Sequence, residues 1–245
     1  MFPPIVMLHH VSDDPLWSSL KPYCISRRSF MQLLDYLEQQ HYETITFETI
    51  ASDRGLLKAP TKKIIISFDD CPKHLFDFAI PELVKRKMKA VFYMPTAHIN
   101  GYNSWDVQEG KARVELMTEQ DLLVLSELGM EVGGHSHHHV KLNGSMNPGA
   151  IQYEISHCKK ILESIVGKPL ISFAFPFAVI PVGYKNYLLN AGYLFGCSIY
   201  QPFENRFALR RFIYHDGDTV KSLQQKLSWQ YRIYRKLTDQ LKKNK

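Results

Sequence analysis

Two adjacent carboxylates, Asp69 and Asp70, end an apolar run that begins at Ile64. Much later in the chain, the histidine-rich segment His135–His139 follows a short run that contains two glycines. A carboxylate and two imidazoles can bind a divalent ion such as Zn²⁺ and leave a coordination position open for water, while a second carboxylate handles protons. Together, the two clusters predict metal-assisted hydrolysis.

The histidine segment offers more than one pair of metal ligands. His135 and His139 are four residues apart, so one helical turn or a compact loop would bring them together. In an extended chain, His137 would instead pair with His135 or with His139. The HxHxDH motif of other metallohydrolases is excluded, because the chain has His139 and Val140 where that motif requires Asp and His.

Each cluster also has a simpler structural interpretation. An Asp-Asp pair at the end of a strand is common in turns and helix caps, and a run of histidines can be a surface turn. Both clusters, however, follow predicted strands. Because the carboxyl ends of parallel strands meet at one edge of an α/β fold, the two clusters are expected to reach one pocket.

Predicted strands and helices alternate along the whole chain. The predicted strands cover residues 5–8, 43–47, 64–68, 90–94, 130–133, 171–174, 193–198 and 212–214. The predicted helices cover residues 27–40, 75–87, 118–128, 147–165 and 184–190, with a last one from Val220. We expect a kink or restart at Pro81. Since the strands are continuous apolar runs, the pattern favours a parallel sheet covered by helices.

The composition is that of a globular protein with a large core. The chain has 245 residues, 45% of them apolar and 22% charged, and one α/β barrel of about 250 residues is ordinary at this length. We find no repeat, low-complexity run or linker that would divide it, so we expect a single domain over residues 1–245. The four cysteines show no CxxC spacing, which predicts reduced thiols.

The two ends of the chain bear on location and partners. The start lacks a basic region, and the apolar stretch Ile5–Leu8 is too short for a signal peptide or a membrane span, so we expect a cytoplasmic protein. Much of the net charge of +6 lies in a basic helix or tail from about residue 220. This end could contact an anionic membrane surface or polymer, but a solvated terminus is the simpler interpretation. We expect no nucleic-acid partner.

Four motifs resemble, in the same order, those of the polysaccharide deacetylase (NodB-homology, carbohydrate esterase) family. Ser67–Asp70 resembles the T/S-F-D-D motif, and His135–His139 resembles the H-S/T-x-x-H motif. Leu8–Val11 is similar to the Y-H-x-V opening of the branch that includes bacterial biofilm-polysaccharide N-deacetylases, and Phe173–Ala178 is similar to its F-A-Y-P-Y-G motif. The resemblance spans residues 5 to about 180.

This resemblance implies a distorted (β/α) barrel of seven strands that hydrolyses N-acetyl groups of an amino sugar or polysaccharide. It implies that Asp70, His135 and His139 bind a divalent metal, zinc before nickel, cobalt or manganese. Asp69 would be the general base. The backbone N–H of Phe177 would help to hold the oxyanion.

The resemblance leaves two candidates for the general acid. In the branch with the Y-H-x-V opening, the histidine of that motif is the acid, which corresponds to His9. The late L-x-H motif of other family members corresponds poorly to Ile213–His215, so His9 is favoured over His215.

Several positions depart from the family pattern. Cys71 and Pro72 follow the two aspartates where Gly-Tyr is usual. Cys71 is a candidate redox-sensitive neighbour of the site or an additional metal ligand, with an inert small side chain as the simpler interpretation. Phe173 stands where many members have an arginine that orients the base, and Arg210 or Arg211 is the candidate replacement.

The usual Tyr, Tyr and Gly of the third motif are replaced by Phe175, Phe177 and Ala178, which removes hydroxyls and predicts an unusual substrate. The candidate aromatic residues for stacking on a sugar ring, each with core packing as the simpler interpretation, are Tyr102, Trp105 and Tyr184. Two alternatives to a sugar deacetylase are an amidohydrolase for a non-sugar C–N bond and a non-catalytic carbohydrate-binding relative.

Overall fold

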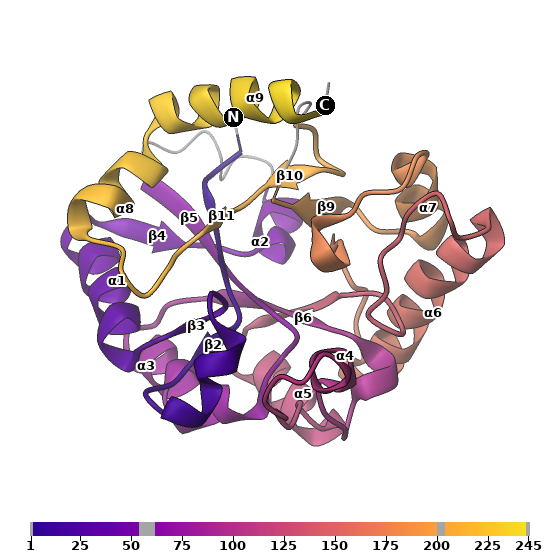
Figure 1. Cartoon of the computed structure of the whole chain (residues 1–245), viewed down its shortest axis with the longest axis horizontal. Helices are drawn as coiled ribbons and strands as arrows, with labels where there is room; N and C mark the ends of the chain where they lie inside the picture. The colour runs from indigo at the N-terminus through magenta and orange to yellow at the C-terminus, as the bar shows by residue number, and fades with distance from the viewer. Residues whose placement is uncertain (1, 54–61, 200–203, 244–245) are drawn as a thin grey trace.

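A parallel sheet, nearly closed into a barrel and surrounded by helices, forms the centre of the protein (Figure 1). The computed structural model describes residues 2–53, 62–199 and 204–243. In these residues the strand path is β10-β9-β8-β7-β6-β5-β1-β11, and β4 pairs with β5 beside it. The strands of this sheet are β1 (Ile5–Leu8), β4 (Tyr42–Thr44), β5 (Lys62–Asp69), β6 (Ala90–Met94), β7 (Glu131–Gly134), β8 (Ser172–Ala174), β9 (Phe195–Ser198), β10 (Leu209–Arg210) and β11 (Phe212–Ile213). A separate pair consists of β2 (His10–Val11) and β3 (Cys24–Ile25).

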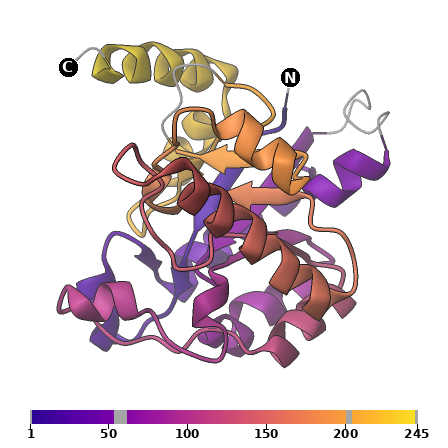
Figure 2. The same ribbon diagram turned by 90° about the vertical axis from the view of Figure 1, so that its right-hand side faces the viewer.

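Helices cover the outside of the sheet (Figures 1 and 2). The α-helices are α1 (Arg27–Gln39), α2 (Phe47–Ser52), α3 (Ala79–Lys85), α4 (Ser104–Gln108), α5 (Glu119–Glu127), α6 (Pro148–Val166), α7 (Tyr184–Ala191), α8 (Val220–Leu227) and α9 (Trp229–Lys243). Short 3₁₀ helices are η1 (Pro15–Leu20), η3 (Lys73–Asp77), η4 (Thr96–His98) and η5 (Pro176–Ala178). None of the described helices is both long and apolar enough to cross a bilayer.

Several helices begin where their capping residues predict. The Ser26 hydroxyl accepts a hydrogen bond from the N–H of Ser29, Thr118 forms a capping box with Asp121, and Asn147 caps α6. The helix expected over residues 75–87 is instead interrupted at Phe78, between η3 and α3. Pro81 lies in the first turn of α3. Backbone N–H groups in the first turn have no partner within the helix, so a proline there costs no helical hydrogen bond.

The strand path, from which β4 is separate, has eight members instead of the seven expected, because one extended segment contributes the two short strands at its ends. Within Leu209–Ile213, β10 pairs with β9 and β11 pairs with β1, all in parallel. Between them, the N–H of Arg211 donates to the carbonyl oxygen of Ser198 at 2.8 Å. This single segment therefore joins the two ends of the sheet and closes the seam of the barrel.

Side-chain alternation in β5 divides the core into two clusters. Ile64, Ile66 and Phe68 pack in the larger cluster, with apolar residues of the surrounding helices. Ile65 packs in the smaller cluster, which contains side chains from the facing strands and fills the barrel interior. By the same alternation, Asp69 points into the barrel rather than toward the helices.

A buried carboxyl group lies at the opposite end of the barrel from the two aspartates. Glu131, the first residue of β7, is fully buried and accepts hydrogen bonds from the Ser172 hydroxyl at 2.5 Å and the Glu48 N–H at 2.9 Å. Burial raises the pKa of Glu131 from 4.5 to about 7. Since the folded state binds this proton more tightly than the unfolded chain, Glu131 makes the protein less stable as the pH rises through this range.

We predict that Glu131→Gln weakens the pH dependence of stability. Between pH 5 and pH 8, the unfolding free energy of wild type should fall by roughly 2–3 kcal/mol through this group, and this part of the fall should be absent in the variant. Urea unfolding at both pH values measures the difference, with exposed Glu119→Gln as the control for a change in net charge. An equal loss in wild type and Glu131→Gln would contradict the assignment.

Candidate functional site

The carboxylates of the two adjacent aspartates lie in different surroundings. Asp69 points into the barrel, where Arg211 donates to its two carboxylate oxygens at 2.5 and 2.7 Å. Asp70 follows the strand and has a positive φ of 68°, and Cys71 continues the left-handed turn with a φ of 51°. Positive φ at two successive non-glycine residues is sterically unfavourable, so contacts with the surrounding structure must stabilise this turn. The turn directs the Asp70 carboxylate toward the histidine segment.

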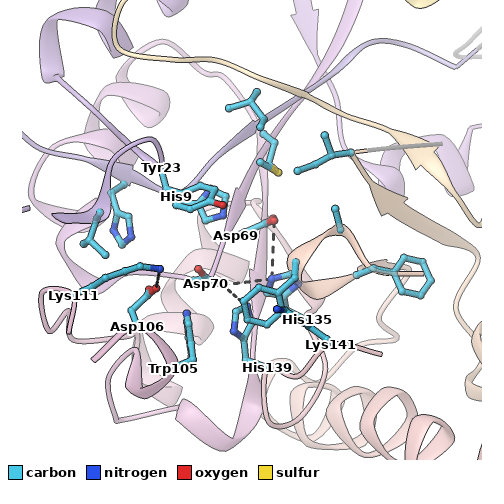
Figure 3. Close-up of a pocket in the computed structure, with 18 of the residues that line it drawn as sticks. His9, Tyr23, Asp69, Asp70, Trp105, Asp106, Lys111, His135, His139 and Lys141 are labelled. Carbon is cyan, nitrogen blue, oxygen red and sulfur yellow. Dashed lines mark hydrogen bonds and ion pairs between the residues drawn. The ribbon is translucent and has the colours of Figure 1, made fainter. Parts of the chain in front are cut away.

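The histidine segment is a compact loop after β7, which brings His135 and His139 together. The distance from Asp70 Oδ1 is 3.4 Å to His135 Nε2 and 3.1 Å to His139 Nε2 (Figure 3). His137 does not join them, because its Nδ1 lies 2.8 Å from the hydroxyl of Thr96. Of the pairs that the sequence left open, the structure therefore forms the one four residues apart.

The donor atoms of Asp70, His135 and His139 fit a divalent metal ion. All three side chains are buried, and one atom from each lies within 4.8 Å of the others. His135 Nδ1 lies 2.8 Å from the carbonyl oxygen of Ala174, so Nδ1 carries a proton, and in the neutral imidazole Nε2 would offer its lone pair to a metal ion beside Asp70. Asp70 Oδ1 is buried and accepts no hydrogen bond from the described residues.

Charge in the site favours ionised carboxylates. Burial alone would raise the pKa of Asp69, but the Arg211 guanidinium outweighs burial and holds this pKa below its ordinary value. Burial likewise opposes ionisation of Asp70, and the adjacent His139 and His135 hold its pKa well below the usual range. Both aspartates are therefore negatively charged at neutral pH.

The two candidate arginines occupy opposite sides of the seam. Arg211 points inward to Asp69, whereas Arg210 points outward and pairs with Asp239 of α9 at 2.9 Å. Of the two candidates, only Arg211 therefore contacts the side chain of Asp69. Phe173, at the position of the usual arginine, is fully buried in the larger core cluster.

The two histidines considered as acids are also separated. His9 lines the same pocket as the aspartates, and its ring packs against Tyr23 with 4.8 Å between centroids (Figure 3). Burial lowers the pKa of His9, although Asp69 and Asp70 partly oppose this effect. His215 does not line the pocket, and its backbone N–H donates to Asp218 at 2.7 Å.

The pocket has a volume of about 400 Å³ and an aromatic wall beside the predicted metal ligands. The ring of His139 contacts those of Trp105, at 3.9 Å between centroids, and Phe177, at 4.7 Å. Phe177 has a φ of 54° and a side chain that is 45% exposed. Of the three aromatic residues considered for stacking on a sugar, Trp105 lines the pocket, whereas Tyr102 packs on Arg113 and Tyr184 on Phe175.

Strained backbone is concentrated around the pocket. Nine described non-glycine residues have positive φ, and six of them lie in the three loops that carry the site. These six are Asp70, Cys71, Ser136, His139, Phe177 and Ala178. Cys71 itself is inert, because it is fully buried and burial next to Asp70 raises the pKa of its thiol well above the ordinary value.

Two residues that contribute to the site were not identified from the sequence. Glu154 of α6 accepts hydrogen bonds from the backbone N–H groups of His137 and His138, at 2.9 and 2.8 Å, and so fixes the histidine loop. The available signal was a carboxylate on the apolar face of a predicted helix. Lys141 lines the pocket rim above the ring of Phe177, at 5.3 Å, and no sequence motif marks it.

Comparison with known proteins agrees with this geometry. The model of the family described as "Polysaccharide deacetylase" matches residues 57–196, more than half of the chain. The protein YxkH of Bacillus subtilis (strain 168), named for polysaccharide deacetylation, is 24% identical over 174 residues, which cover 71% of this chain and 56% of that protein. The poly-beta-1,6-N-acetyl-D-glucosamine N-deacetylase of Staphylococcus aureus (strain MRSA252) is 20% identical over 209 residues, which cover 80% of this chain and 70% of that protein. The chain thus spans little more than half of the first relative.

A solved structure confirms the fold. The Streptococcus pyogenes deacetylase PplD, solved in complex with acetate, superposes with a TM-score of 0.77 at 19% identity, covering 92% of this chain and 98% of that one.

Proposed function

Because this chain belongs to the polysaccharide deacetylase family, we propose that it removes N-acetyl groups from an amino sugar or a polysaccharide with the help of a divalent metal ion. The observation that supports this most strongly is the convergence of Asp70, His135 and His139 beside an arginine-bound Asp69 in one pocket. The curated relative from S. aureus is named for the same reaction on a polymer of N-acetylglucosamine.

Asp70, His135 and His139 are the proposed ligands, for zinc first and for nickel, cobalt or manganese as alternatives. When bound, the ion supplies Lewis acidity, which lowers the pKa of water at the site and polarises the amide carbonyl of the substrate. Two neutral imidazoles and one carboxylate leave a divalent ion with net positive charge, which suits this chemistry.

Asp69 is the proposed general base. Arg211 keeps this carboxylate ionised and holds it in one orientation, with Asp69 Oδ2 4.0 Å from His135 Nε2 and so beside the proposed metal ligands. A carboxylate in this position can take a proton from the attacking water as the C–O bond forms.

His9 and Phe177 would complete the reaction. His9 lines the pocket beside Asp69 and would donate a proton to the leaving amine, which is otherwise a very poor leaving group. The backbone N–H of Phe177 would stabilise the oxyanion of the tetrahedral intermediate. The aromatic rings of Trp105 and Tyr23 provide flat apolar surfaces in the same pocket, which suit the faces of sugar rings.

We predict that His135→Ala and His139→Ala abolish both metal binding and acetate release from N-acetylglucosamine oligomers, because each removes one of only three ligands. Metal content of the purified proteins and enzymatic assay of acetate measure the two effects. His138→Ala is the matched control from the same loop, because the main-chain bonds to Glu154 remain and the metal should be retained.

The same assays separate the alternatives. Acetate release that persists without metal in the histidine variants would refute the proposed mechanism. Metal binding with hydrolysis of non-sugar amides alone would identify an amidohydrolase of different specificity. If the wild type binds none of the candidate ions after loading and hydrolyses no substrate, the chain is a non-catalytic relative.

We predict a separate effect for the proposed acid. His9→Gln should lower kcat by about 10²–10⁴-fold while metal content stays unchanged, because only proton donation is lost. His215→Gln should retain activity within about twofold, since this residue lies outside the pocket. Steady-state kinetics on the same oligomers test both variants, and the reverse order of effects would transfer the role to His215.

A further inference from the structure

The C-terminal helix α9 packs on the protein with its charged face. Asp239 is buried and pairs with Arg210 at 2.9 Å, beside the seam of the barrel. Arg232 donates to the carboxylate of Glu204 at 3.1 Å and to the carbonyl oxygen of Phe2 at 2.5 Å. These polar contacts hold α9 along one edge of the molecule, where Figures 1 and 2 show it projecting from the body of the fold.

The opposite face of α9 is apolar and exposed. Trp229, Ile233, Tyr234 and Leu237 are 62%, 50%, 60% and 56% exposed. Their spacing of four, five and eight residues from Trp229 places them on one side of a helix, and we call these four residues the α9 stripe. A surface helix ordinarily turns its apolar face to the core, so the reversed orientation leaves this stripe for a partner.

The charge of the chain is concentrated at the same end. Residues 220–245 contain eight Lys or Arg and one Asp, a formal charge of +7, so the remainder of the chain carries −1 within the total of +6. A second copy of the chain would bring like charges together across the stripe, which disfavours a dimer through this face. Within this end, Lys226, Arg232 and Arg235 pair with acidic side chains of the protein. Lys221 and Lys236 are exposed, and an anionic lipid surface would attract them.

The types of residue in the stripe fit a lipid interface. Trp and Tyr combine an apolar ring with a polar group and favour the headgroup level of a bilayer, while Ile and Leu bury their side chains slightly deeper. Lys236, which is exposed next to Leu237, can reach the lipid phosphates. A helix with a strongly one-sided apolar face and flanking cations lies in the plane of the interface without crossing it.

We propose that the α9 stripe docks the protein on an anionic lipid bilayer surface. The pocket stays accessible in this orientation. Helix α4, which carries Trp105 at the pocket, lies on the side away from α9 in both Figure 1 and Figure 2.

The test is co-sedimentation of the full chain with phosphatidylcholine vesicles that contain phosphatidylglycerol, compared with pure phosphatidylcholine vesicles. We expect binding to the anionic vesicles only, and at least about a tenfold weaker partition for the triple variant Trp229→Ser/Ile233→Ser/Leu237→Ser. The matched control is Val182→Ser/Leu189→Ser/Leu194→Ser, which removes exposed apolar side chains in and beside α7 instead of α9 and should bind as wild type does.

Further measurements separate docking from misfolding and from self-association. Both triple variants should keep the wild-type thermal unfolding temperature, because the changed side chains are exposed. Trp229→Phe should still bind but lose a blue shift of tryptophan emission upon vesicle addition. No binding by wild type, or equal binding by the stripe variant, would overturn the proposal. So would a wild-type dimer that the stripe variant converts to a monomer.

Discussion

The buried ion pair between Arg211 and Asp69 is the interaction on which the site depends. Two neighbouring carboxylates would repel each other in a pocket, and both would compete for the same positive charge. Arg211 neutralises Asp69 from inside the barrel and leaves Asp70 to the imidazoles. The left-handed turn at Asp70 and Cys71 completes this division, because it directs the second carboxylate toward His139 and His135 and away from Arg211. Breaking such a buried pair by removing one partner typically costs about 3–5 kcal/mol.

The same extended segment connects the interior of the barrel with its surface. Successive side chains of a strand point to opposite faces, so Arg211 reaches Asp69 while Arg210 reaches Asp239 of α9. The segment also pairs with β9 on one side and β1 on the other. The last helix, the closure of the sheet and the orientation of the proposed base therefore depend on five consecutive residues.

The sequence predicted those features of the structure that depend on residues close together in the chain. It predicted the helices that begin near residues 27, 118 and 147, the buried strand before Asp69 and the two polar clusters at strand ends. The choice between Arg210 and Arg211 was not, because it depends on the register of strands only two residues long. The outward apolar face of α9 was equally hidden, since an amphipathic pattern does not reveal which face meets the protein. Glu154 stands out as a carboxylate on the apolar face of a predicted helix, but its main-chain partners lie in another element and cannot be read from that pattern.

The division of work between the two aspartates is tested most directly by measuring bound metal and acetate release in Asp69→Asn and Asp70→Asn. We expect Asp69→Asn to retain about one metal ion per chain and to release no acetate, because the three ligands remain and only the base is lost. Asp70→Asn should lose both the metal and the activity. Loss of metal in both variants, or an active Asp69→Asn, would contradict the separate roles.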